Sequence, residues 1–591
     1  MTIRFKSTRS GLGGRLALLA AILALLWQAP VAGAATDYSE VIKDLERDIR
    51  RTMRGEDIAG AALVLIDGQR VVHERAYGEA SADDERRMTT TTPMLVGDFS
   101  KIPATIAVLQ LVAAGKVDLE APVTDYLDLT FSGRAANERP PLVRELLTHH
   151  SGLAPNRFAG SFGPVQPMGI TLIEPLPRTQ PPGVIYSYSQ LGFQVLAALV
   201  EKVSGRPYVD YVAEAVLGPL ELTDAGFVAT AATAQPHDRK GRQKDAVFPR
   251  ELGALGLFAS IRDLGKLLRW VLAGEGAPVM TDALFGEMTR EQNADIPLDL
   301  DNRVALGWQM TNTGNHKVDR LLRLYSGTFR HRGLILIAPE EQLAVALIAN
   351  SSAASEFVPE TAAEALDLML EAKLGREPPD EDPELPERLA LPSGAAARAM
   401  EPRYSTPLGE LQLEGDESRY EMELVGRKFG AKLREDGWYE ISFKLFGVIS
   451  LRFSVLAEVL IRPATLGGQS VLLAHFRGSD LLFGTGLEDI PPAPELEAWA
   501  GRYRIANPDL IIENLEIETV DLVFDEGLLY LEYEIPSTTI AVEPRVPLVP
   551  FGPDRLYVPG LGINTGDTIA LGRFEGRRTL TFSGWQLVEE R

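Results

Sequence analysis

Cysteine is absent from this 591-residue sequence. Its absence excludes disulfide bonds, thiol nucleophiles, thiolate metal ligands and a lipid-modified N-terminal cysteine. Histidine is scarce as well: the seven histidines include no His-x-His or His-Glu-x-x-His spacing of the kind that metal sites use. We therefore expect neither a metal site nor a bound cofactor.

Basic residues are also fewer than acidic ones. The chain has 59 basic and 82 acidic side chains, which gives a formal charge of −23. A surface this negative repels phosphate backbones and anionic lipids, which argues against nucleic acid or a membrane surface as a partner. An acidic excess also keeps globular proteins soluble, so it identifies no partner by itself.

Long apolar runs are missing except for one near the N-terminus, from Leu16 to Trp27. Three basic residues precede this run: Lys6, Arg9 and Arg15. Ala32-Gly33-Ala34 follows it, so residues 1–34 are predicted to be a signal peptide with cleavage near Ala34/Ala35. Because the run is too short to cross a bilayer, we expect a periplasmic or secreted protein with no transmembrane segment in the mature chain.

The length of the chain is too great for one hydrophobic core and predicts several domains. An apolar content of 45% and a charged content of 24% are those of ordinary globular proteins. A proline-rich, acidic stretch, "LGREPPDEDPELPERLALPSG", is typical of a linker. We predict an α/β domain over 36–374, a linker over 375–396, and two β modules over 397–492 and 493–591.

Patterning in the first domain predicts a mixed α/β fold. Two β-rich runs between Ala61 and Gly78 flank Asp67-Gly68, which is a hairpin signal. Strand-like runs return between Arg320 and Asn350, so we expect an antiparallel sheet that pairs the first strands with the last. Helical periodicity predicts the flanking helices, over residues 37–53, 103–114, 141–148, 192–203 and 261–272.

Beyond the linker, short β-rich runs alternate with Gly, Pro and Asp turns, which favours small antiparallel barrels or sandwiches. "AMEPRYST" from Ala399 and "AWAGRYRI" from Ala498 share an Ala-x-x-x-Arg-Tyr pattern. The match is short, but it agrees with two β modules of about equal size.

One segment, "VGDFSKIPATIAVLQLVAAGKVDLEAPV" from Val96 to Val123, contains candidate catalytic residues. Serine acyl-transfer enzymes of the Ser-x-x-Lys type place a hydroxyl and an amine one helical turn apart, so that the amine accepts the proton of the hydroxyl. Here Lys101 stands at the amine position, but Asp98 stands where the hydroxyl is needed.

Four segments in order resemble the serine β-lactamase and penicillin-binding-protein superfamily, in the branch that holds class C β-lactamases, D-alanyl-D-alanine carboxypeptidases, D-aminopeptidases and esterases. Val96–Val123 is similar to the family's "IGSVSKTFTATAVLQLVEEGKLDLDDPV". "LLTHHSGL" from Leu146, "PPGVIYSYSQLGFQVLAALVEKVSGRPYVDYV" from Pro181 and "GLFASIRDLGKLLRW" from Gly256 are similar to three further family segments. D-aminopeptidases of this branch also carry two C-terminal β-barrels, so the resemblance implies that the β modules are small, lipocalin-like barrels.

The resemblance also implies which residues form the site. Asp98, at the substituted nucleophile position, Lys101 and Tyr188 correspond to catalytic residues. Four residues correspond to substrate-binding positions: Gln190, in place of the family's Asn, and Tyr325-Ser326-Gly327, in place of Lys-Thr-Gly or His-x-Gly.

The replacement of serine by Asp98 argues against acyl-enzyme chemistry. Asp98 is expected at the first turn of a helix, where the dipole favours a carboxylate, with Lys101 as its ion-pair partner. An amine held in an ion pair stays protonated, and loss of such catalytic groups costs several orders of magnitude in rate. Ser100 cannot substitute, because Pro103 stands three positions after it.

Three functions remain open. The first is a degenerate serine hydrolase that is retained for binding or regulation of a small peptide or peptidoglycan-like ligand. In this case the Asp98–Lys101 pair is a salt bridge in a former active site. The second is an active hydrolase of D-amino-acid peptidase, esterase or β-lactamase type that uses a non-standard catalytic set. The third is a scaffold whose function lies in the β modules. The sequence does not define the oligomeric state.

Overall fold

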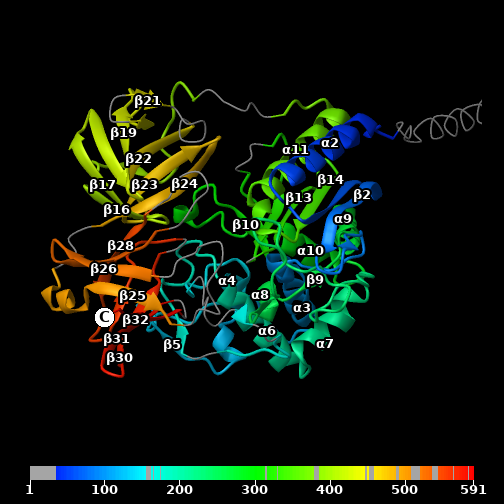
Figure 1. The fold of residues 1–591 in the computed structure, drawn as a ribbon, viewed down its shortest axis with the longest axis horizontal. Coiled ribbons are helices and arrows are strands. Elements are labelled where there is room, and N and C mark those ends of the chain that lie inside the picture. The colour runs from blue at the N-terminus through cyan, green and yellow to red at the C-terminus, as the bar shows by residue number, and fades with distance from the viewer. Residues whose placement is uncertain are drawn as a thin grey trace, which may run out of the picture.

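In the computed structural model, an α/β domain is followed by two all-β modules (Figure 1). The structure describes residues 35–154, 162–163, 166–172, 175–312, 316–328, 330–378, 385–445, 449–451, 458–487, 492–506, 519–534, 543–562, 565–582 and 585–590. The predicted signal peptide, residues 1–34, lies outside these ranges. Within them, no helix combines the length and the apolar character needed to cross a bilayer.

The α/β domain is built on an eight-stranded antiparallel sheet. Its strands, in spatial order, are β10 (Val304–Ala305), β11 (Trp308–Gln309), β12 (Leu322–Gly327), β13 (Arg332–Ala338), β14 (Leu343–Ala349), β1 (Gly60–Asp67), β2 (Arg70–Ser81) and β3 (Arg86–Arg87). Ala61 of β1 faces Ala349 of β14, which confirms that the first strands pair with the last. Gly68 has a positive φ of 59° in the β1–β2 turn, as the hairpin signal predicts.

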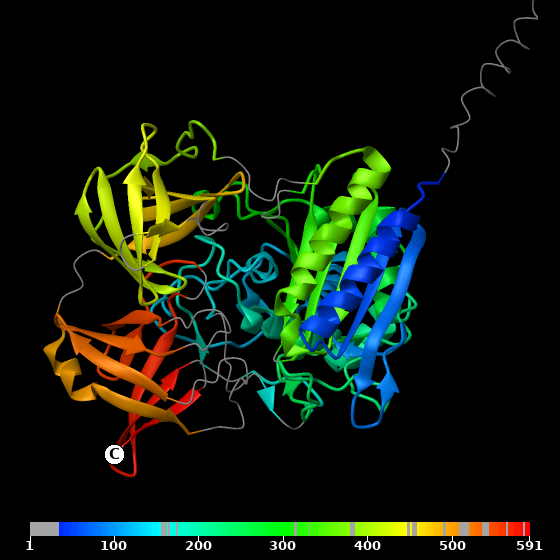
Figure 2. The same ribbon diagram turned by 45° about the horizontal axis from the view of Figure 1, so that its top comes forward.

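The two faces of the sheet bury different helices. On β1, Ala61, Leu63 and Leu65 pack with α2 (Ser39–Gly55) and α11 (Phe357–Leu374), which lie side by side across one face (Figure 2). The alternate residues of β1 pack on the other face against α9 (Ile261–Ala273), in a core that also contains residues of α3 (Lys101–Ala113) and α6 (Gln190–Ser204). Burying each large apolar side chain contributes roughly 1.5–3 kcal/mol, so this central strand is held from both sides.

All five predicted helices are present, as α2, α3, α4 (Val143–Leu147), α6 and α9. Ser189 and Ser260 cap α6 and α9, each accepting a backbone N–H in the first turn. Among the described residues, four further α-helices were not predicted: α7 (Tyr208–Val212), α8 (Leu252–Leu255), α10 (Asp282–Thr289) and α11. Short elements complete the domain: β4 (Met94–Leu95), β5 (Phe131–Ser132), β6 (Phe162–Gly163), β7 (Leu176–Pro177), β8 (Phe248–Pro249), β9 (Phe258–Ala259) and the 3-10 turn η1 (Gly97–Ser100).

The first β module is an eight-stranded ring. Its strands, in chain order, are β16 (Arg403–Thr406), β17 (Gly409–Asp416), β18 (Arg419–Leu424), β19 (Arg427–Leu433), β20 (Tyr439–Leu445), β22 (Val459–Leu466), β23 (Gln469–Phe476) and β24 (Ser479–Gly486). Pairing of β20 with β22 and of β24 with β16 closes the ring, which β15 (Ala396–Ala397) and β21 (Ile449–Leu451) extend. Closure leaves no open sheet edge around the ring.

The second module is a closed barrel of eight strands: β25 (Gly501–Ile505), β26 (Thr519–Asp525), β27 (Leu528–Glu532), β28 (Arg545–Pro550), β29 (Arg555–Tyr557), β30 (Thr568–Phe574), β31 (Arg577–Phe582) and β32 (Trp585–Glu589). Two barrels after an α/β domain confirm the predicted fold class. The Arg-Tyr repeat falls on β16 and β25, the first strand of each ring. Tyr404 and Tyr503 are fully buried in the two barrel cores, so the repeat marks equivalent positions.

Candidate active site

The predicted site lies where η1 leads into α3, beside the end of β12. Gly97 has a φ of 50°, and a Cβ there would lie 2.5 Å from the Ser326 Oγ and 2.7 Å from the Thr328 Cγ2. Only glycine therefore allows this turn and this close approach of β12. The turn presents Asp98 at the start of α3, one helical turn before Lys101.

Three donors converge on one carboxylate oxygen, the Oδ1 of Asp98. The Lys101 ammonium and the Tyr188 hydroxyl both donate to it, and the Gln190 Nε2 donates from 3.1 Å. Lys101 also donates to the Tyr188 oxygen over 2.7 Å, as Gln190 does over 3.0 Å. Four of the predicted site residues thus form one closed network around an acceptor.

The third motif, on β12, completes this network with two groups. The Ser326 Oγ accepts the backbone N–H of Asp98 over 3.1 Å, and the Gly327 N–H donates to the Asp98 Oδ2 over 3.4 Å. Tyr325 makes neither contact. Its side chain is 37% exposed, and the ring lies against Gly327, where a Cβ would meet the Tyr325 Cε1 at 3.2 Å.

Burial sets the electrostatics of the network. The Lys101 side chain is 1% exposed and that of Asp98 is 6% exposed. Burial lowers the pKa of the Lys101 amine, and the adjacent carboxylate acts against this by favouring the ammonium. Burial and the Asp98 charge hold the pKa of Tyr188 well above its ordinary value, so the phenol keeps its proton and donates it to Asp98.

His149, which lies in the "LLTHHSGL" segment, belongs to the wall of the site. It adopts a φ of 61°, and its Nδ1 accepts the backbone N–H of Ser189 over 3.1 Å. Its ring lies 4.6 Å from the Tyr188 ring and 5.3 Å from the Phe193 ring. Burial lowers the pKa of His149 far below its ordinary value, so it packs as a neutral ring. The "LLTHHSGL" segment was the sequence feature that could have indicated this role of His149.

Ser100 is fixed to the backbone. Its hydroxyl donates to the Gly97 carbonyl over 2.6 Å and accepts the Leu257 N–H over 2.9 Å. The side chain is fully buried and joins η1 to the segment before β9. It is therefore a structural residue, as its position relative to Pro103 indicates.

Both β modules reach the edge of this site. A cavity of about 340 Å³ is lined by residues from all three modules, among them Tyr186, Gln309, Arg323, Pro407, Phe483, Leu561 and Gly562. The Gly562 carbonyl accepts hydrogen bonds from the Gln180 Nε2 over 3.2 Å and from the Ser187 Oγ over 3.4 Å. A loop of the second barrel is thus bonded to the residue directly before Tyr188.

The described side chains include no group of three or more His, Asp or Glu that could hold a metal ion. The network around Asp98 offers charged and hydrogen-bonding groups. It contains an anion held by an ammonium, a phenol, an amide and a backbone N–H, and it contains no serine at position 98.

Comparisons with known proteins agree with this geometry. A family model described as "Beta-lactamase" matches residues 45–369. "Esterase EstB" of Burkholderia gladioli is 31% identical over 210 residues, which are 33% of this chain and 53% of that protein. "Putative penicillin-binding protein PbpX" of Bacillus subtilis is 29% identical over 199 residues, which are 33% of this chain and 49% of that protein. The chain therefore spans about half the length of these relatives.

Among solved structures, the one described as "Crystal structure of SurE" has a TM-score of 0.52 and 21% sequence identity. The match covers 75% of this chain and 98% of that chain. At this identity it shows a shared fold.

Proposed function

Because this chain belongs to the beta-lactamase family over residues 45–369, we propose that it is an exported member that has lost serine acyl transfer and retains its cleft to bind a peptide or cell-wall-like ligand. One observation carries the proposal: the groups that correspond to the catalytic machinery all point at the Asp98 carboxylate. They hold a fixed anion where the reaction needs a free nucleophile.

The loss of acyl transfer follows from proton positions. A serine nucleophile must give its proton to a neutral amine or a phenolate within hydrogen-bond reach. Here the Lys101 amine donates to a carboxylate and the Tyr188 phenol keeps its proton, so neither group accepts one. A carboxylate is also a weak nucleophile towards an amide. Loss of such a set lowers the rate of an enzyme by several orders of magnitude.

Ligand binding is supported by what the site retains. The Oδ2 of Asp98 accepts one long hydrogen bond within the described ranges, from Gly327, so it has acceptor capacity for an N–H or hydroxyl of a ligand. The adjoining cavity of about 340 Å³ has the volume of a small-ligand site and combines apolar walls with Gln309 and Arg323. A relative named as a penicillin-binding protein makes a peptide or peptidoglycan fragment the natural class of ligand to test.

Export is part of the proposal. It is supported by the basic, apolar and Ala-x-Ala order of residues 1–34. Expression in a Gram-negative host followed by N-terminal sequencing of the periplasmic fraction tests it. The expected sequence begins at or next to Ala35, and a full-length cytoplasmic product would contradict export.

Covalent labelling tests the loss of acyl transfer. We expect a fluorescent penicillin and a fluorophosphonate to leave the purified protein unlabelled, whereas calorimetry detects binding of a peptidoglycan stem peptide that ends in D-Ala-D-Ala. Asp98→Ala should abolish this binding, and the exposed Asp295→Ala is the matched control. Labelling of the unchanged protein would overturn the proposal.

An active hydrolase is the second candidate, because one relative is named as an esterase. In that case Asp98 would act as a general base or nucleophile. Steady turnover of p-nitrophenyl acetate that Asp98→Asn abolishes would favour this function over the proposed one.

A further inference from the structure

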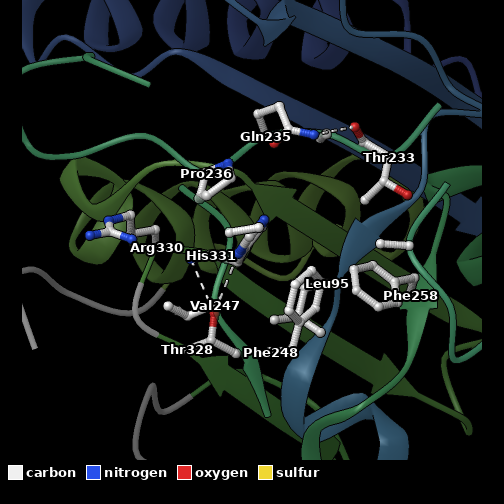
Figure 3. A pocket seen from close by; sticks show the side chains of 13 residues that line it. Leu95, Thr233, Gln235, Pro236, Val247, Phe248, Phe258, Thr328, Arg330 and His331 are labelled. Atoms are coloured by element: carbon white, nitrogen blue, oxygen red, sulfur yellow. Dashed lines mark hydrogen bonds between the residues drawn. The ribbon is translucent and has the colours of Figure 1, made fainter. Parts of the chain in front are cut away.

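A second, smaller cavity lies beside the end of β12, between the segments 229–236 and 246–248 (Figure 3). Its volume is about 160 Å³, and its walls are mainly apolar: Leu95, Ala234, Pro236, Val247, Phe248 and Phe258. An apolar protein cavity of about 150 Å³ is large enough to bind benzene. The space therefore fits the body of a leucine-sized or phenyl-sized group.

One polar side chain that lines this space has a ring nitrogen without a hydrogen-bond partner among the described residues. His331 is 8% exposed and lines the cavity among the apolar side chains (Figure 3). Its backbone N–H donates to the Thr328 Oγ1 over 3.2 Å, and its Nδ1 lies 3.5 Å from the same hydroxyl. For the Nε2 of His331, the described residues provide no hydrogen-bond partner. Unpartnered buried polar atoms are rare in folded proteins.

Thr328 favours one tautomer of the His331 ring. Its hydroxyl accepts the His331 backbone N–H and lies 3.5 Å from Nδ1, to which it can donate its own hydrogen, and in that tautomer the ring hydrogen is on Nε2. Burial, with the nearby Arg332 charge, lowers the pKa of His331 to about 3, so the ring is neutral at physiological pH. In that tautomer Nε2 is a neutral donor, and the described residues give it no acceptor oxygen.

The cavity adjoins the Asp98 network. Thr328 follows Gly327, whose N–H contacts Asp98, and the Thr328 Cγ2 lies 2.7 Å from the Cβ position of Gly97. Leu95 stands on β4, directly before the same turn. A ligand bound at Asp98 therefore lies next to this space.

We propose that this cavity is a binding subsite for a compact apolar side chain that carries one acceptor oxygen, such as a phenol, with His331 as its hydrogen-bond donor. The subsite rests on the proposed function, because it takes a side chain of the peptide-like ligand. It also binds the isolated side-chain group, so it can be tested separately.

The test uses phenol and benzene as probes with the full-length protein, followed by ligand-observed NMR. Phenol should bind about three- to tenfold more tightly than benzene, because one hydrogen bond is added. His331→Phe should remove this preference. Ala246→Leu, which fills the cavity, should lower the affinity for both probes at least about tenfold. The control, Ala121→Leu, lies in a half-buried turn away from the cavity and should leave both affinities unchanged.

Equal phenol affinity in the unchanged protein and in Ala246→Leu would overturn the subsite. A crystal soaked with phenol gives a result that does not depend on the folding of any variant: a ring between His331 and Val247 supports the subsite, and phenol bound only elsewhere overturns it. Competition between N-acetyl-D-tyrosine and phenol supports the subsite and the proposed function together. Phenol bound in the cavity without such competition supports the subsite and counts against the proposed function.

Discussion

The ammonium of Lys101 and the carboxylate of Asp98 form an ion pair that is almost sealed from solvent. The two residues are three positions apart at the start of α3, so the helix itself sets their distance. Removing both charges from water is costly, and the hydrogen bonds from Tyr188, Gln190 and Gly327 offset part of that cost. A pair held by these hydrogen bonds is a rigid anion site, in contrast to a mobile nucleophile and base.

Asp98→Ser should restore slow acylation. The change supplies the hydroxyl and removes the charge that keeps the Lys101 amine protonated, while burial continues to lower the pKa of that amine. We expect weak covalent labelling by a fluorescent penicillin, detected by gel fluorescence and intact mass. Asp98→Ser combined with Lys101→Met should remove the label. A folded Asp98→Ser protein without label would show that Gln190 and Tyr325 also block the reaction.

Lys101→Met should destabilise the α/β domain by about 3 kcal/mol or more, because it leaves a buried carboxylate without its counter-charge. Adding Asp98→Asn should recover most of this loss, since both charges are then gone. Native-state hydrogen exchange of the α3 amides measures the change where it occurs. A loss that is equal in the single and double variants would mean that packing of the lysine stem, and not its charge, stabilises this region.

The low pKa of His331 should make the protein less stable as the pH falls, at pH values above those at which most carboxylates titrate. Its pKa is about 3 in the folded protein and 6.5 ordinarily, so between these values the unfolded chain binds a proton that the folded chain does not. The free energy of unfolding should therefore fall as pH falls from 6.5 to 4.5, by up to about 1.4 kcal/mol per pH unit. His149 adds to the loss in the same direction, because its pKa is also lowered.

Comparison with His331→Phe isolates this contribution. Urea denaturation from pH 8 to 4.5 should give a shallower slope for the variant below pH 6.5, and parallel curves above pH 7, where the histidine is neutral in both states. Identical slopes throughout would contradict the low folded-state pKa of His331.

The sequence predicts those features that local patterns encode. The Asp67-Gly68 hairpin, the mixed sheet that pairs the first strands with the last, and the all-β character of the two modules are predicted from periodicity and turn residues. That the β modules are barrels is implied by the family resemblance. The contact between Asp98 and Lys101 follows from helical spacing alone. Their convergence with Tyr188, some ninety positions away along the chain, is implied by the family resemblance and by no local signal.

Other features depend on contacts that no local pattern records. Helix α11 carries Pro359 in its first turn, where proline is tolerated, although in a sequence it indicates a break. His149 becomes part of the site only because the turn at residues 149–152 packs against Tyr188 and Phe193. The bond between Gln180 and Gly562 joins residues 382 positions apart, so only the folded structure reveals it.

Gly566→Ala should loosen the docking of the second barrel on the α/β domain, with Gly576→Ala as a matched control. Both glycines have a φ of 78°, so both substitutions carry the same backbone strain of about 1 kcal/mol. A Cβ on Gly566 would lie 2.6 Å from the Thr179 Cβ, whereas at Gly576 nothing lies within 4 Å. Only the first substitution should therefore push the loop at Gly562 away from Gln180 and Ser187. Small-angle scattering should show a larger radius of gyration, and trypsin should cut faster in residues 375–396, for Gly566→Ala alone. Equal behaviour of the two variants would mean that this loop does not hold the barrel over the site.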